Sequence, residues 1–87
     1  MPWERIMSSS QTTSSVKSPG NVAIIRVEGS GNQTFKLESS RAGANVFIEE
    51  KDINIIDVIS PIPDTDYRIK ASGSGKEVYY QEIPLEL

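Results

Sequence analysis

The sequence predicts an all-β fold, a small antiparallel β-sandwich of about six to seven strands. From residue 21 onward, short segments alternate apolar and polar side chains, which is the pattern of half-buried strands. Glycine, proline and asparagine cluster between these segments, where tight turns need them. No stretch keeps the apolar spacing of an amphipathic helix over several turns.

The predicted strands follow one another at short spacing. They cover residues 21–28, 33–39, 45–50, 53–59, 67–72 and 76–85. Residues 53–59 (INIIDVI) are apolar on both faces, as expected of a central strand. Lys51 and Asp52 are predicted to form a tight hairpin link. Pro84 cannot donate to a ladder, so the last strand should end there or lie at an edge.

Residues 1–20 are predicted to form a flexible N-terminal arm with a Ser/Thr-rich linker, and residues 21–87 the folded domain. Residues 8–15 are Ser, Thr and Gln only, so this part of the arm has nothing to bury. Ahead of it lie Trp3 and Ile6, two large apolar side chains on a tether. Such a segment either docks on another chain, for instance as an added strand, or is a disordered tail. In both cases the domain should fold without it.

Composition excludes several classes of function. The 87 residues include no cysteine and no histidine, so no disulfide, thiolate or imidazole metal site or histidine-based catalytic triad is available. The net charge is −3, and the acidic excess lies outside the N-terminal arm. An acidic domain is not expected to bind nucleic-acid phosphates or anionic membrane surfaces. No signal peptide or membrane span is visible, and no enzyme activity or cofactor is predicted.

A proline-led turn followed by a tyrosine stands out at residues 63–67. Pro63 opens the turn, and Tyr67 then begins an alternating strand. Sandwich domains fix a strand corner in this way, with the ring packed inward and the hydroxyl bonded to nearby backbone. We therefore expect a buried Tyr67 whose hydroxyl bonds backbone within residues 59–64. Both residues are predicted to be structural.

Two segments resemble known families of small β-sandwich. Residues 63–71 (PDTDYRIKA), followed by a glycine turn and a closing strand, resemble the E–F corner and F–G hairpin of fibronectin type III domains, which share the immunoglobulin-like sandwich. Residues 39–51 are similar to the signature of PEGA domains, in which Gly-Ala leads into an alternating strand. Both resemblances imply a non-catalytic spacer or binding module, and neither implies particular site residues.

Acidic residues gather at two places. Asp64 and Asp66 flank a threonine, and Glu49, Glu50 and Asp52 form a second cluster. Loops of sandwiches that bind Ca²⁺ use such oxygen ligands. The simpler interpretation, which we favour, is an Asx-type turn at Asp64 with the other carboxylates solvated. No metal site is therefore predicted.

Asp57 interrupts the apolar segment 53–59. On the face of Ile53, Ile55 and Ile59 it would be a buried acid, which is costly without a partner. One interpretation is a carboxylate tuned for function. We favour a core face made by Ile56 and Val58, or a bulge that turns Asp57 outward.

Aromatic residues supply the candidate interaction surface. Tyr79 and Tyr80 are adjacent, so one of them should face outward. With Phe47 it would make a flat aromatic surface for a sugar or a protein. The alternative is that the outward tyrosine shields an edge strand.

The sequence as a whole predicts a non-enzymatic structural or protein-interaction module. A virion or tail-associated component, or a module of a surface protein, fits the size, the β-rich pattern and the N-terminal arm. A protein partner or self-assembly through the edge strands and the arm is expected. The alternative function is a carbohydrate-binding accessory module. The expected location is a virion or an extracellular surface.

Overall fold

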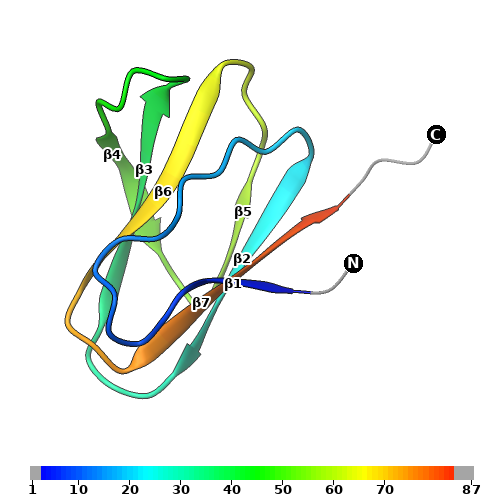
Figure 1. Cartoon of the computed structure of the whole chain (residues 1–87). Coiled ribbons are helices and arrows are strands. Elements are labelled where there is room, and N and C mark those ends of the chain that lie inside the picture. Colours follow the sequence, from blue (N-terminus) through cyan, green and yellow to red (C-terminus); the bar gives the residue numbers. More distant parts are fainter. Residues whose placement is uncertain (1–2, 84–87) are drawn as a thin grey trace.

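The prediction of an all-β sandwich is confirmed: seven antiparallel strands form two sheets (Figure 1). The computed structural model describes residues 3–83, and no helix occurs among them. The strands are β1 (Glu4–Met7), β2 (Val22–Gly29), β3 (Thr34–Arg41), β4 (Ile48–Ile53), β5 (Ile56–Ile59), β6 (Thr65–Ser72) and β7 (Lys76–Ile83). One sheet has the order β1-β7-β2-β5 and the other the order β4-β3-β6.

The core lies between the two sheets and is filled by alternate residues of each strand. In β2 the inward residues are Ala23 and Ile25, and in β7 they are Val78 and Tyr80. The facing sheet contributes five further large side chains: Phe35, Leu37, Ile53, Tyr67 and Ile69. Burial of one such side chain stabilises the fold by about 1.5–3 kcal/mol. The period of two seen in the sequence is therefore the period of core packing.

The N-terminal arm is the largest departure from the sequence-based prediction. Within residues 1–20, which were expected to be flexible, Glu4–Met7 form strand β1 and pair with β7 in the register Glu4↔Tyr80. The bulge after Arg5 turns two consecutive side chains inward. Ile6 and Met7 are 6% and 1% exposed and belong to the core. Residues 1 and 2 lie outside the described residues.

After a turn the arm crosses to the other sheet and runs along β6 (Figure 1). Tyr67 and Lys17 exchange two backbone hydrogen bonds of 2.7 and 2.8 Å, and the Ser14 N–H donates to the Ile69 carbonyl at 2.8 Å. The Ala71 N–H donates to the Thr12 carbonyl at 2.7 Å. A Ser/Thr-rich segment can fill this role because the edge of β6 requires backbone groups, not apolar side chains. The arm thus closes one margin between the sheets.

The end of β4 and the start of β5 also differ from expectation. β4 continues through Lys51 and Asp52 to Ile53, so these two residues are not a hairpin link; residues 54–55 make the connection. β5 pairs only with β2 and is an edge strand, although its apolar sequence predicted a central one. The predicted extension of the last strand to residue 85 lies outside the described residues.

β6 and β7 lie in different sheets, so they are not the paired hairpin that the fibronectin resemblance implied. The turn between them instead packs against the turn between β2 and β3. A Cβ atom on Gly75, whose φ is +110°, would lie 2.5 Å from the Ser30 carbonyl oxygen. A Cβ atom on Gly29 would be similarly close to the Gly75 carbonyl oxygen, at 2.6 Å. Glycine at these positions lets the two turns touch.

Candidate functional site

The two outer faces of the sandwich differ sharply in polarity. The outer side of the three-stranded sheet carries Thr34, Lys36 and Glu38 on β3, and Arg68 and Lys70 on β6. This is the polar alternation of an ordinary solvated face. The outer side of the four-stranded sheet, called here the four-stranded face, is different. It comprises Trp3, Arg5, Val22, Ile24, Arg26, Glu28, Ile56, Val58, Glu77, Tyr79, Gln81 and Ile83.

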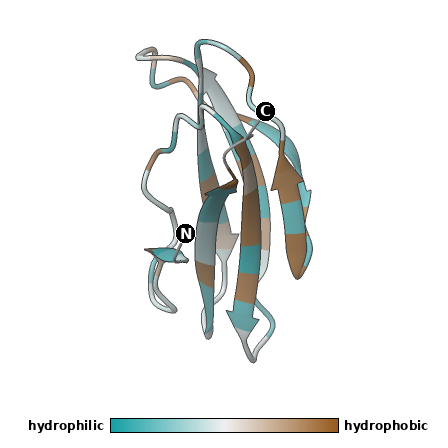
Figure 2. Cartoon of the chain, turned by 90° about the vertical axis from the view of Figure 1, so that its right-hand side faces the viewer, coloured by the Kyte–Doolittle hydropathy of each residue, from teal (hydrophilic) through white to brown (hydrophobic). Residues whose placement is uncertain are grey.

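Strand register makes the apolar members of the four-stranded face neighbours. Ile24 on β2 pairs with Val58 on β5, and Val22 pairs with Ile83 on β7. Figure 2 views the molecule from this side and shows hydrophobic segments recurring along the strands in front. On this face Ile56 is 60% exposed, Val58 50% and Ile83 43%. A contiguous apolar patch on a sheet face usually marks an interaction site.

An arginine and two aromatic rings occupy one end of the four-stranded face. The Arg26 guanidinium lies 4.6 Å from the Trp3 ring centroid and 5.7 Å from the Tyr79 ring centroid. Its Nη2 atom is 2.8 Å from the Glu28 carboxylate, while Nε is buried with no hydrogen-bond partner among residues 3–83. The rings therefore provide the main contacts for that side of the guanidinium. Trp, Tyr and Arg are the residues most enriched at binding hot spots.

The predicted interaction residues fall into three groups. Trp3 and Tyr79 come together on the four-stranded face. Ile6 and Tyr80 are instead core residues, 6% and 5% exposed, because their strand positions point inward. Phe47 lies near the opposite sheet, where the Arg68 guanidinium is 4.1 Å from its ring. Phe47 therefore does not extend the surface made by Tyr79.

Arg26 was not singled out in the sequence. Its position in the first predicted strand, residues 21–28, alternates with inward residues, which places it outward. Its neighbours follow only from the register, in which Arg26 pairs with Tyr79 on one side and Ile56 on the other.

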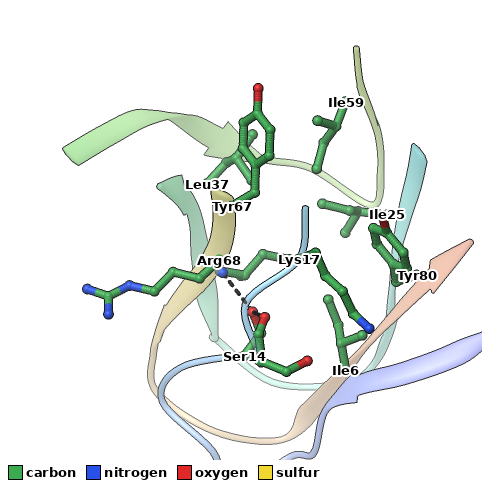
Figure 3. A pocket seen from close by; sticks show the side chains of 11 residues that line it. Ile6, Ser14, Lys17, Ile25, Leu37, Ile59, Tyr67, Arg68 and Tyr80 are labelled. Carbon is green, nitrogen blue, oxygen red and sulfur yellow. Dashed lines mark hydrogen bonds between the residues drawn. The ribbon is translucent and has the colours of Figure 1, made fainter. Parts of the chain in front are cut away.

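Tyr67 is buried, as predicted, but the tyrosine corner is not formed. Its ring is 5% exposed, and its hydroxyl makes no hydrogen bond to any residue of 3–83. Figure 3 shows that hydroxyl directed away from Lys17 and Tyr80. The Tyr67 backbone is held by Lys17 instead. Pro63 still belongs to a tight turn, since its carbonyl accepts the Thr65 hydroxyl at 3.2 Å and Asp64 has φ of +58°.

Asp57 and Lys51 link the two edge strands at the open margin of the sandwich. The Lys51 ammonium donates to the Asp57 Oδ1 atom at 2.7 Å, and the Asp57 side chain is 18% exposed. The expected core face of Ile56 and Val58 was wrong, because both are exposed and Asp57 shares the inward side with Ile59. The ion pair with Lys51 in the other sheet offsets the desolvation cost of the Asp57 carboxylate at this inward position.

The same ion pair protects the β5 edge. The Val58 N–H, which points away from β2, donates to Asp57 Oδ1 at 3.0 Å, and the Val58 carbonyl is 3.4 Å from the Lys51 Nζ atom. The β4 edge carries exposed charges at residues 49–52. Charged side chains on edges discourage pairing with another chain. The edge strands, expected to mediate assembly, are thus poorly suited to it.

Acid should weaken this link between β4 and β5. The hydrogen bond from Lys51 holds the pKa of Asp57 below its usual value, the Val58 N–H acts in the same direction, and burial opposes them. A depressed folded-state pKa contributes stability above the unfolded value of about 3.9, and this is lost as pH falls through the folded pKa. We expect Asp57→Asn to lower the unfolding free energy by up to about 1 kcal/mol at neutral pH, since Lys51 is half exposed.

Urea melts of wild type and Asp57→Asn at about pH 7 and about pH 2.5 measure this difference. The difference in unfolding free energy between the two proteins should be smaller at the lower pH. A gap that stays constant across that range would show that the ion pair is not its cause.

The other candidates for a binding site are the acidic side chains and the pocket drawn in Figure 3. Among residues 3–83 no cluster of three acidic side chains could hold a metal ion. Asp66 accepts hydrogen bonds from the Ser18 hydroxyl and, at 3.2 Å, from the Gly43 N–H. The pocket drawn in Figure 3 has a volume of about 10 Å³. It lies between Ile25, Ile59 and neighbouring core side chains and has room for one water at most.

Comparison with known proteins adds no relative. No protein-family model, curated protein or solved structure matches the chain. Within residues 3–83 there is no helix long and apolar enough to cross a membrane. The candidate site therefore rests on geometry alone, and it is the four-stranded face.

Proposed function

We propose that the protein is a non-enzymatic structural or protein-interaction module that makes its contact through the four-stranded face. The observation that carries this proposal is the contrast between the two outer faces of one sandwich. One is polar, while the other exposes Ile56, Val58 and Ile83 beside a Trp–Arg–Tyr cluster. Apolar side chains on a solvated sheet face contribute little to folding, so a partner that covers them explains their presence.

The broader assignment follows from the same reasoning. A component of a virion or tail, or a module of a surface protein, is the setting we propose, and kinship with fibronectin type III or PEGA domains remains part of that proposal. Carbohydrate binding has less support. Sugars stack on open aromatic faces, whereas the Arg26 guanidinium already lies over the Trp3 and Tyr79 rings.

Site-specific photo-crosslinking in cells tests the contact surface. A photoreactive amino acid at Ile56 should give a protein adduct, because this side chain lies on the four-stranded face. The matched control replaces Ile48, which is 62% exposed but belongs to β4 in the other sheet. Any adduct formed from position 56 and not from 48 supports the proposal, whether the captured protein is a second copy or another chain. Equal yields from both positions, or none from 56, would contradict it.

A further inference from the structure

We infer that the four-stranded face binds a second copy of this chain, so that two sandwiches pack face to face about a two-fold axis. This inference rests on the function proposed above and names the partner. A two-fold contact places the same surface on both copies, so the surface must be compatible with itself in charge, shape and area.

Charge is the first requirement. The four-stranded face carries two cations and two anions, and each is paired within the chain. Arg5 Nη1 is 3.0 Å from the Glu77 carboxylate, and Arg26 is paired with Glu28. The face is therefore neutral, although the chain carries a net charge of −3. A neutral, internally paired surface meets its own copy without repulsion, whereas the acidic β4 edge would repel its copy.

Shape and area are the second requirement. The principal extents of the molecule are 39 × 29 × 17 Å, and Figure 2 shows the side that carries the four-stranded face as taller than it is wide. The strands β1, β7, β2 and β5 have four, eight, eight and four residues. With a spacing of ~4.8 Å between strands and a rise of ~3.3 Å per residue, they give a contact of about 750 Å² summed over both copies. Contacts below about 1,200 Å² are typical of weak, transient complexes. We therefore expect a weak, reversible dimer.

Edge pairing, the competing route to self-association, is obstructed at both margins. The outward N–H of Val58 on β5 donates to the Asp57 carboxylate, and the outward carbonyl of Val58 accepts from the Lys51 ammonium. At the opposite margin the N-terminal arm joins β1 to β6. Packing through the face involves neither margin and would bury Ile56, Val58 and Ile83.

Sedimentation equilibrium of the full chain, from about 10 μM to about 1 mM, tests the inference. Wild type should move from monomer toward dimer across this range. Ile56→Lys and Ile83→Lys each put a positive charge on the neutral face, so self-association should weaken at least about tenfold. Ile48→Lys makes the same change at a similarly exposed position of the other sheet and should leave dimerisation unchanged. Thermal melts establish that all three variants remain folded.

Spin labels identify the face. Since the chain has no cysteine, one label per copy can be placed at Ile24→Cys or at Lys36→Cys. Labels at position 24 should lie close together across the interface. Labels at position 36, on the outer side of the three-stranded sheet, should lie farther apart, because both sandwiches separate them.

The outcomes separate the inference from the proposed function. If the wild type stays monomeric at every concentration, the inferred dimer is wrong. A photo-adduct with another protein at position 56 would in that case still support the proposed interaction function. A dimer in which the position-36 labels are the closer pair overturns both. Dimerisation weakened equally by Ile48→Lys also contradicts a contact through the four-stranded face.

Discussion

A chain that lacks residues 1–17 should fail to fold. The deletion removes Ile6 and Met7 from the core and exposes the inner edges of β6 and β7. It also leaves the buried Ile69 N–H without the Ser14 hydroxyl that accepts it at 2.8 Å. Loss of two buried side chains costs about 2–5 kcal/mol each, which together equals the whole stability of a small domain. Circular dichroism and urea melts of the truncated chain measure the effect.

Point variants divide the deletion into its parts. Met7→Ala should lower the unfolding free energy by about 2–5 kcal/mol, because Met7 is 1% exposed. Val16→Ala is the matched control in the same arm; Val16 is 47% exposed, and the change should stay within about 0.5 kcal/mol. A truncated chain that melts like the wild type would restore the flexible, dispensable arm predicted from the sequence.

Tyr67→Ala should be nearly as damaging, while Tyr67→Phe should be almost neutral. The ring packs between Leu37 and Ile59 at the inner face and is 5% exposed, so its removal leaves a cavity that costs about 3–5 kcal/mol. The hydroxyl contributes little, since none of residues 3–83 bonds to it. Tyr67→Phe should therefore change the unfolding free energy by less than about 0.5 kcal/mol. Denaturant melts of the two variants supply both values.

The pair of variants decides between two roles for Tyr67. A tyrosine corner depends on the hydroxyl, and breaking its bond to backbone would cost about 1 kcal/mol or more. A Phe variant with that loss would restore the corner. Packing alone predicts that only the Ala variant is destabilised.

The strands were predictable because alternation with a period of two follows directly from a sheet with one buried face. The arm was not predictable, because its contribution is mostly backbone pairing, which Ser and Thr provide as well as other residues. Ile6 was noticed as a large apolar side chain, but nothing local shows whether such a side chain enters its own core or a partner. That depends on β6 and β7, which lie far along the chain.

The site was predictable only in part, for a related reason. Trp3 and Tyr79 attract notice as single aromatic residues, yet their meeting with Arg26 depends on strand register. The apolar segment 53–59 signals that both faces need cover. The sequence alone does not show whether the second face of this strand is buried within the same domain, as in a central strand, or against another molecule. We propose the latter for the exposed Ile56.

The position of β1 has a consequence for how the chain folds as it is synthesised. Of the seven strands, the one synthesised first, β1, pairs with the one synthesised last, β7, in the register Glu4↔Tyr80. The arm must therefore wait, unpaired, until β7 has been made. Because closure joins residues so distant in sequence, folding belongs to the slow class of β-sandwiches, milliseconds to seconds. The pairing of β1 with β7 therefore completes the sandwich only after residue 83 has left the exit tunnel.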